Sequence, residues 1–474
     1  MPRIARVSSG GAANATDKAF ESWLDVQLAH SARGMLASVS PTSIVKQRAG
    51  FGQTVRPVAG AIVASPVLGD YNPDPDYFFH WFRDSAVVID ALRLLHLDGR
   101  IGAPALQHLR DFIRFSLALN GLDGRAVVAA QGRKDKVVPE LLQYLREDDD
   151  LSRVQGEAVA AETRVNPDGT LDILRWARPQ HDGPPLRALA LLRWVGSGRL
   201  DAQLLAEVAP LIRFDIDFTL HHWREPSFDI WEEESGHHYY TLRVSAAALS
   251  EGAAWLEGVG ETAQAARCRD ESQAVLRLLD GYWVDEGDEH EAMRGYYRSR
   301  VLADGADGAD SAKALDIAVI LSAIHCAGTG VAHAPADARM QATLARLDAL
   351  FEAAYPINHG RAADRGAAMG RYDGDVYCSG GAYYFSTLGA AEFCFRAAER
   401  GDLRDRDGWI ARGDAYLATV RAYTPASGEL SEQFDQRSGV QTSAKQLAWS
   451  HAAFISCVFA RRAALAGREE LRAR

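Results

Sequence analysis

Twelve segments of this chain carry hydrophobic residues at helical spacing, and the connections between them alternate between long and short. The segments are 17–37, 80–96, 105–120, 185–197, 201–222, 241–258, 261–284, 311–327, 335–355, 382–400, 408–423 and 443–465. The long connections follow the odd-numbered segments, at 38–79, 121–184, 223–240, 285–310, 356–381 and 424–442. This pairing predicts an all-α fold.

The even-numbered segments are apolar on nearly every side, whereas the odd-numbered segments are amphipathic. Residues 317–321 read Ile-Ala-Val-Ile-Leu, while segment 105–120 combines Leu109 and Phe112 with Arg110. A helix that is apolar all round is buried, and an amphipathic helix faces solvent on one side. Six inner helices alternating with six outer helices predict an (α/α)6 barrel.

We expect one domain, the barrel over residues 17–467, preceded by a flexible N-terminal tail over residues 1–16. An α-solenoid is the alternative helical architecture, but its repeats would recur at a fixed period, and we find no such period. In the barrel, every long connection precedes an inner helix. All six would therefore meet at one mouth, and function concentrates in loops held by such a scaffold.

The charge of the chain restricts its partners. Its 63 acidic and 52 basic residues give a net charge of −11, which disfavours nucleic acid and anionic membranes as partners. Five scattered cysteines without CxxC spacing predict neither a zinc site nor a disulfide framework. We find no secretory signal and no membrane-spanning stretch, so we expect a cytoplasmic protein. We expect neither a metal nor a cofactor. The sequence predicts no oligomeric state.

Two of the long connections carry acids among aromatic or apolar neighbours. Glu232 lies in the third, in the run Phe-Asp-Ile-Trp-Glu-Glu-Glu-Ser-Gly over 228–236, and Glu432 lies in the sixth, in Gly-Glu-Leu-Ser-Glu-Gln-Phe-Asp over 428–435. Splitting a glycosidic bond requires two carboxyl groups on either side of it, one protonated and one ionised. A pair of this kind can supply them.

Other connections carry residue types that suit a sugar. Arg83 and Asp84 follow Trp81 in the first, and a guanidinium, a carboxylate and an indole can hold hydroxyls and the apolar face of a ring. Arg371 lies among aromatic residues, including Tyr383, in the fifth. Structural roles explain these motifs as well: a local ion pair at a helix start for the first, and plain packing for the fifth.

With these residues in place, the chain resembles the glucoamylases of glycoside hydrolase family 15 over nearly its whole length. The resemblance covers 22–24, 60–66, 81–84 and 447–450 together with the acid motifs, in the family's order. It implies an (α/α)6 barrel that releases β-glucose, with inversion, from the non-reducing ends of soluble α-glucans. The oligosaccharide is then the partner.

By motif position, the resemblance implies Glu232 as the general acid and Glu432 as the general base that activates water. A general acid must stay protonated. We expect Trp231 and the negative charges of Glu233 and Glu234 to keep Glu232 protonated. The resemblance implies most of the candidate substrate-binding residues, and Trp231 and Tyr383 are added as neighbouring aromatics. The full set is Tyr77, Trp81, Arg83, Asp84, Trp176, Arg178, Trp231, Glu233, Arg371, Tyr383, Gln433 and Trp449.

The chain departs from the family pattern at two places. His80 and Phe82 flank the first-loop tryptophan where many members have threonines, and 379–383 reads Ser-Gly-Gly-Ala-Tyr instead of Asn-Gly-Asn-Pro-Trp. We expect these positions to lie toward the rim of the pocket and the leaving-group side, where they bear on linkage. Neither a starch-binding module nor an N-terminal β-sandwich is expected within the chain, which favours soluble oligosaccharides over granular starch.

Three other functions remain open at this point. An exo-enzyme for α-1,6-glucosides or trehalose would share both glutamates and differ on the leaving-group side. A phosphorylase on a similar barrel would use phosphate in place of activated water and would need no second carboxylate. A non-catalytic domain that binds glycan or a regulatory partner would tolerate loss of the two acids, both of which this chain keeps.

Overall fold

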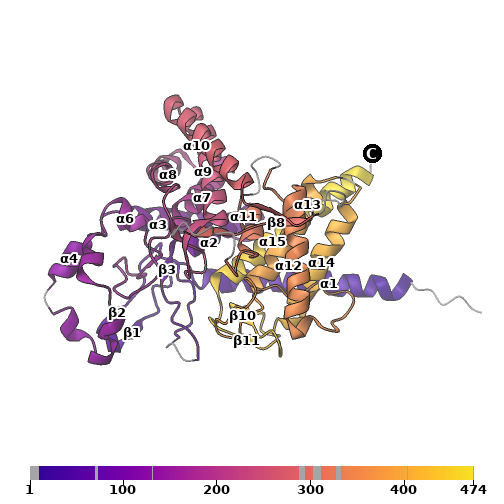
Figure 1. Cartoon of the computed structure of the whole chain (residues 1–474), viewed down its shortest axis with the longest axis horizontal. Coiled ribbons are helices and arrows are strands. Elements are labelled where there is room, and N and C mark those ends of the chain that lie inside the picture. The colour runs from indigo at the N-terminus through magenta and orange to yellow at the C-terminus, as the bar shows by residue number, and fades with distance from the viewer. Residues whose placement is uncertain are drawn as a thin grey trace, which may run out of the picture.

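The structure is a computed structural model, and it describes residues 10–69, 73–130, 132–287, 294–302, 311–326, 332–402 and 404–472. In this part of the chain, twelve helices have eight or more residues (Figure 1). They are α1 (Gly10–Leu36), α2 (Phe82–Leu97), α3 (Ala103–Leu119), α7 (Gly183–Gly196), α8 (Ala202–His222), α9 (Tyr239–Gly258), α10 (Thr262–Asp280), α11 (Ala318–His325), α12 (Ala338–Ala354), α13 (Tyr384–Arg400), α14 (Arg406–Tyr423) and α15 (Ala448–Arg472).

Six of these helices form a closed inner ring. α2 packs on α7, α7 on α9, α9 on α11, α11 on α13 and α13 on α15, and α15 packs back on α2. The other six lie outside them, and α1 runs beside α15, so the first and last helices are neighbours. The predicted (α/α)6 barrel is confirmed, with the predicted inner and outer helices.

Two helix boundaries differ from the sequence prediction. α1 begins at Gly10, within the segment predicted as a flexible tail, and residues 1–9 lie outside the described residues. α11 begins only at Ala318, although a start at 311 was predicted. The carboxylate of Asp316 accepts a hydrogen bond from the Ala318 backbone N–H at 2.8 Å, and this sets where the helix starts.

The second long connection contains short helices that the periodicity did not predict. They are α4 (Gly124–Ala129), α5 (Asp148–Ser152) and α6 (Glu157–Ala160), with 3-10 turns at Lys134–Lys136 and Pro139–Tyr144. Segments of four to six residues are too short for a 3.6-residue period to show. In Figure 1, α4 and α6 lie on the side of the molecule away from α12 and α14.

Short strands and bridges join the long connections around the mouth. The strands are β1 (Lys46–Arg48), β2 (Gln53–Val55), β3 (His80–Trp81), β4 (Arg164–Val165), β5 (Ser227–Phe228), β6 (Ser235–His238), β7 (Trp283–Asp285), β8 (Gly295–Tyr297), β9 (Arg300–Leu302), β10 (Gln433–Phe434) and β11 (Gln441–Thr442). All strand pairs are antiparallel. Links between neighbouring connections run, in order, through β3–β4, Phe228 to Pro179, β6–β9, Asp316–Tyr372, Tyr383–Gln433 and Ala448 to Ala64.

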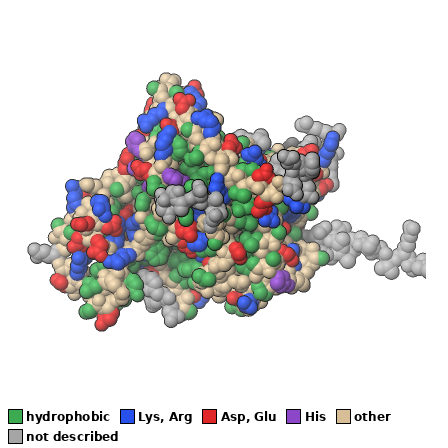
Figure 2. Space-filling model, viewed as in Figure 1, with side chains coloured by type: hydrophobic (Ala, Val, Ile, Leu, Met, Phe, Trp, Pro, Cys, Tyr) green, Lys and Arg blue, Asp and Glu red, His purple; other side chains and the backbone are tan. Residues whose placement is uncertain are grey.

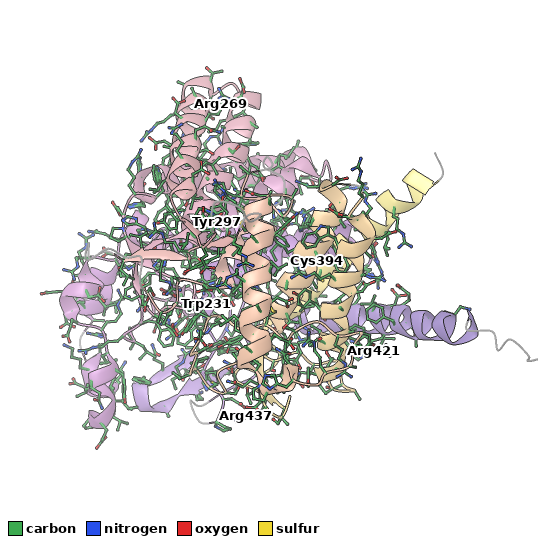
Figure 3. All side chains as sticks on the ribbon, turned by 45° about the vertical axis from the view of Figure 1, so that its right-hand side comes forward. Trp231, Arg269, Tyr297, Cys394, Arg421 and Arg437 are labelled. Carbon is green, nitrogen blue, oxygen red and sulfur yellow. The ribbon has the colours of Figure 1, made fainter. Side chains whose placement is uncertain are left out.

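The hydrophobic core occupies the inner ring. Figure 3 places Trp231 near the middle of the molecule, with Arg269 of α10 and Arg437, between β10 and β11, toward its edges. On the face shown in Figure 2, acidic and basic side chains are mixed and hydrophobic side chains gather near the middle. Among the described residues, no helix has the length and apolar character that crossing a bilayer requires.

Candidate active site

Both acid-bearing connections reach one pocket at the mouth of the barrel, with a cavity of about 190 Å3. Eleven of the fourteen predicted site residues line it: Tyr77, Trp81, Arg83, Asp84, Trp176, Trp231, Glu232, Glu233, Arg371, Glu432 and Trp449. Five further lining residues were not predicted: Ala64, Ile230, Tyr377, Phe385 and Leu447. Cavities for drug-sized ligands hold roughly 300–1,000 Å3, so this one suits a single small ring.

Glu232 is held in an unusual backbone conformation by a tight turn. Its φ is +67°, a left-handed value that a non-glycine residue rarely adopts. The carboxylate of Asp229 closes the turn by accepting from the backbone N–H groups of Trp231 at 2.7 Å and Glu234 at 2.8 Å. Backbone strain of this kind persists only where surrounding contacts fix it, and it gathers at functional sites.

Three nitrogen donors point at the Glu232 carboxyl group. Trp81 Nε1 donates to Oε1 at 2.8 Å, and Arg83 Nη2 lies 3.1 Å from the same oxygen. Trp176 Nε1 donates to Oε2. Because indole and guanidinium groups only donate, the carboxyl accepts hydrogen bonds at both oxygens.

Hydroxyl groups hold Glu432, the second carboxyl. Tyr77 Oη donates to Oε1 at 3.3 Å, and Ser443 Oγ donates to Oε2. Glu432 is 9% exposed, and burial raises its pKa from 4.5 to about 7, although Ser443, Arg371 and Tyr77 each lower it. A carboxyl group of this pKa is ionised above about pH 7 and protonated below it.

Arg83 and Asp84 begin α2 inside the pocket. Arg83 donates to Asp182 at 3.0 Å as well as to Glu232, and its Nε lies 3.9 Å from the Asp84 carboxylate. Burial raises the pKa of Asp84 to about 7, against the lowering effect of Arg83. The pair presents a guanidinium and a carboxyl side by side, which suits two adjacent hydroxyl groups.

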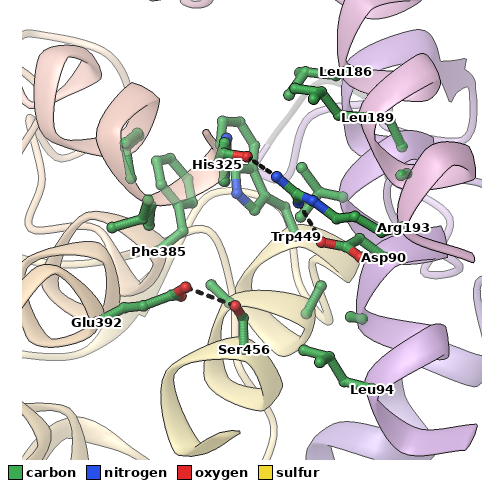
Figure 4. A pocket seen from close by; sticks show the side chains of 18 residues that line it. Asp90, Leu94, Leu186, Leu189, Arg193, His325, Phe385, Glu392, Trp449 and Ser456 are labelled. Atoms are coloured by element: carbon green, nitrogen blue, oxygen red, sulfur yellow. Dashed lines mark hydrogen bonds and ion pairs between the residues drawn. The ribbon is translucent and has the colours of Figure 1, made fainter. Parts of the chain in front are cut away.

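Stacked aromatic rings form a floor between the active-site pocket and a smaller cavity in the inner ring. Phe385 stacks on Trp449 with centroids 4.5 Å apart and on Trp231 at 6.0 Å. Phe385 and Trp449 line both cavities. The smaller cavity, whose lining is drawn in Figure 4, holds about 40 Å3, too little for a sugar ring. Arg193 crosses it to Asp90 at 2.7 Å. The active-site pocket is therefore closed at its inner end.

Cations neutralise the two acids that follow Glu232. Glu233 pairs with Arg371 at 3.0 Å and with Lys313, and Glu234 pairs with Arg300 at 2.9 Å. From the sequence, these two negative charges were expected to help keep Glu232 protonated. In the structure, both carboxylates form ion pairs with these cations.

Three predicted substrate-binding residues, Arg178, Tyr383 and Gln433, lie outside the pocket lining. Arg178 binds Glu162 at 2.6 Å and Asp172 at 3.0 Å. Tyr383 is fully buried, and its hydroxyl donates to Asp375 at 2.9 Å and accepts from Gln433 Nε2 at 2.7 Å. These residues brace the connections that carry the pocket residues.

The departures at His80 and Phe82 also lie away from the pocket rim, contrary to expectation. Side chains alternate between the two faces where a chain is extended, so Trp81 faces the pocket and its neighbours face the other way. The buried His80 ring lies 4.9 Å from that of Phe115, and Phe82 joins the same cluster. These two departures therefore adjust packing behind the site.

Trp176 separates the active-site pocket from a larger neighbouring cavity of about 640 Å3. Phe51 and Tyr144 line this cavity with aromatic rings, and Arg175 lies at its side. Trp176 is 39% exposed and Tyr144 53% exposed. Arg164 packs its guanidinium 3.5 Å from the Trp176 ring and holds it in place.

Glycoside hydrolases cleave a glycosidic bond with two carboxyl groups in one pocket that holds a sugar. The pocket with Glu232 and Glu432 has this arrangement, which places the chain among the glycoside hydrolases. A profile described as Glycosyl hydrolases family 15 matches residues 44–121, 162–411 and 404–459. The chain belongs to this family.

Individual relatives agree with the profile. The chain is 27% identical to the glucoamylase of Neurospora crassa over 86% of its own length and 64% of that protein's. It is 27% identical to the probable glucoamylase of Schizosaccharomyces pombe, covering 94% of this chain and 93% of that protein. Among solved structures, the Hormoconis resinae glucoamylase superposes with a TM-score of 0.73 at 26% identity, covering 93% of this chain and 73% of that one.

Proposed function

We propose that the chain is an inverting, exo-acting α-glucosidase of the glucoamylase type, which releases β-glucose from the non-reducing ends of soluble malto-oligosaccharides. The observation that carries this proposal is the placement of Glu232 and Glu432 in one pocket with a closed inner end. Family membership supports the same chemistry.

The pocket accounts for action at a chain end. One sugar ring packs on the aromatic floor, and Arg83 and Asp84 hold its hydroxyl groups. Because the floor closes the pocket, a glucan chain cannot pass through, and the bond that reaches the carboxyls joins the terminal ring to the next one. Trp176 then lies beside the departing sugar.

The two carboxyls divide the chemistry. Glu232 gives a proton to the glycosidic oxygen, and Trp81, Arg83 and Trp176 hold its carboxyl in position. Glu432 takes a proton from the attacking water while Tyr77 and Ser443 hold its two oxygens. Attack by water on the face opposite the leaving group inverts the anomeric centre.

Reaction products of maltopentaose that carries a fluorescent label at its reducing end test the proposal. Exo-action from the non-reducing end moves the label stepwise to labelled maltotetraose and then maltotriose. Early appearance of several labelled products together would show internal cleavage and contradict it.

Maltose, isomaltose and trehalose, compared at equal concentration with and without phosphate, separate the remaining alternatives. We expect maltose to be cleaved fastest and the rate to be independent of phosphate. A preference for isomaltose or trehalose would identify the related exo-enzymes, and a rate that requires phosphate would identify a phosphorylase.

A further inference from the structure

Three side chains that can bind a metal, from two parts of the chain, meet beside the second long connection. His181 lies just before α7, His222 ends α8, and Glu225 follows it in the next connection. One ligand atom from each lies within 4.8 Å of the others. No metal site was predicted from the sequence, in which the five cysteines are scattered and lack CxxC spacing.

His181 supplies the independent observation. Its side chain is 4% exposed and packs against the rings of Phe218 at 5.7 Å and His222 at 5.5 Å. Its Nδ1 is buried and has no hydrogen-bond partner among the described residues. Buried polar atoms are almost always paired, so an unpaired imidazole nitrogen beside two further ligand groups requires an explanation.

His222 is held as a metal-bound histidine would be. Its Nδ1 lies 2.8 Å from Glu225 Oε2, and its Nε2 lies 3.3 Å from Glu157 Oε2. A histidine that binds a metal through one nitrogen normally donates its other N–H to a carboxylate, and Glu157 occupies that position. The carboxyl end of α8, where the helix dipole is negative, also favours a cation.

We infer that His181, His222 and Glu225 bind one divalent transition-metal ion of the zinc class, with Glu157 as the outer carboxylate. Two imidazoles and a carboxylate are ligands that zinc prefers, and three protein ligands leave a fourth position for solvent. Zinc ligands lie about 2.0–2.2 Å from the ion, so the side chains draw together on binding.

The ion ties the active-site wall to an outer helix. His181 lies between Gln180, which donates to the Asp229 carbonyl at 2.7 Å, and Asp182, which pairs with Arg83 at 3.0 Å. Binding therefore fixes this segment against α8. Glu157 falls between the matched ranges 44–121 and 162–411, so part of the site comes from a region outside the family match.

Calorimetric titration of the tag-free, chelator-treated chain with zinc chloride tests the site. We expect saturable binding of about one ion and a higher Tm in its presence, since a ligand that binds only the folded state stabilises it. His222→Gln and Glu225→Gln should each weaken binding at least tenfold and abolish the Tm rise. Glu157→Gln should weaken it about 10–100-fold, as loss of an outer partner does.

His359→Gln, at an exposed histidine elsewhere, is the matched control and should bind zinc as the parent chain does. Circular dichroism establishes that each variant is folded, and Glu225 is exposed, so its replacement leaves the core intact. Absence of saturable binding by the parent chain, or equal affinity in the His222 and Glu225 variants, would overturn the inference.

Discussion

Ser443 donates a hydrogen bond from its hydroxyl to Oε2 of Glu432, the carboxyl proposed to activate water. Burial raises the pKa of Glu432 to about 7, and this hydrogen bond lowers it because the ionised carboxylate accepts more strongly. The pair therefore sets the pH at which the base becomes available.

The acidic limb of the pH profile should follow Glu432. The base must be ionised, so kcat/KM should fall as the pH drops through about 7. Ser443→Ala removes a contact that lowers the pKa of Glu432 and should move this limb to higher pH. Initial rates on maltotriose between pH 5 and 9 measure it, and an unmoved or acid-shifted limb would remove Ser443 from this role.

Glu432→Gln should abolish most turnover and leave the fold intact. A positioned general base commonly contributes about 10²–10⁴-fold, and an amide cannot accept the proton. Steady-state glucose release gives the loss. Glu429→Gln, in the same connection and outside the pocket lining, is the control and should keep near-parental kcat. Near-normal turnover by the Glu432 variant would exclude it as the base.

The same substitution should stabilise the protein in alkaline solution. The folded state raises the pKa of Glu432 from 4.5 to about 7, so stability falls as the pH rises between these values. At pH 8 the buried charge costs on the order of 3 kcal/mol, which glutamine avoids. Urea unfolding should show a gain at pH 8 that shrinks toward pH 4; a gain independent of pH would have another cause.

Trp176→Phe should slow the chemical step more than it weakens substrate binding. Phenylalanine keeps an aromatic ring beside the leaving group but cannot donate to Oε2 of Glu232. We expect kcat to fall about tenfold with a smaller change in KM, measured on maltotriose. Trp255→Phe on α9 is the control for loss of an indole outside the pocket lining. A pure KM effect would limit Trp176 to ring packing.

Tyr144→Ala should affect long substrates more than short ones. Tyr144 lines the neighbouring cavity beyond Trp176, where we expect the rest of a longer chain to lie. Loss of one stacking ring should raise KM for maltopentaose several-fold and leave KM for maltose nearly unchanged. Equal changes for both sugars would show that this cavity takes no part in substrate binding.

The sequence predicted the barrel because each inner helix carries its own hydrophobic pattern. α13 is buried at nearly every position from Tyr384 to Ala398, and this all-round apolar character is visible without any tertiary information. The two glutamates and Arg83 could be located from motif position and connection order. The apolar character of one helix is a local property of the sequence, and so is an acid among aromatic or apolar neighbours.

Contacts between distant connections could not be predicted in the same way. Tyr383 and Gln433 belong to pocket motifs, yet a bridge between their backbones turns both side chains inward behind the wall. His80 differs from Trp81 only by the alternation of one short strand. Phe385 contributes to the floor from the first turn of α13, where the sequence pattern indicates only a core position. Each of these side-chain positions depends on tertiary packing, which a local sequence pattern does not show.

A proton NMR time course of maltotriose hydrolysis, which follows the anomeric signals in the first minutes, tests the proposed roles of Glu232 and Glu432 most directly. We predict β-glucose and maltose as the first products, because water activated by Glu432 attacks opposite the leaving group. Early α-glucose would mean retention through a covalent intermediate and would contradict the roles given to both residues.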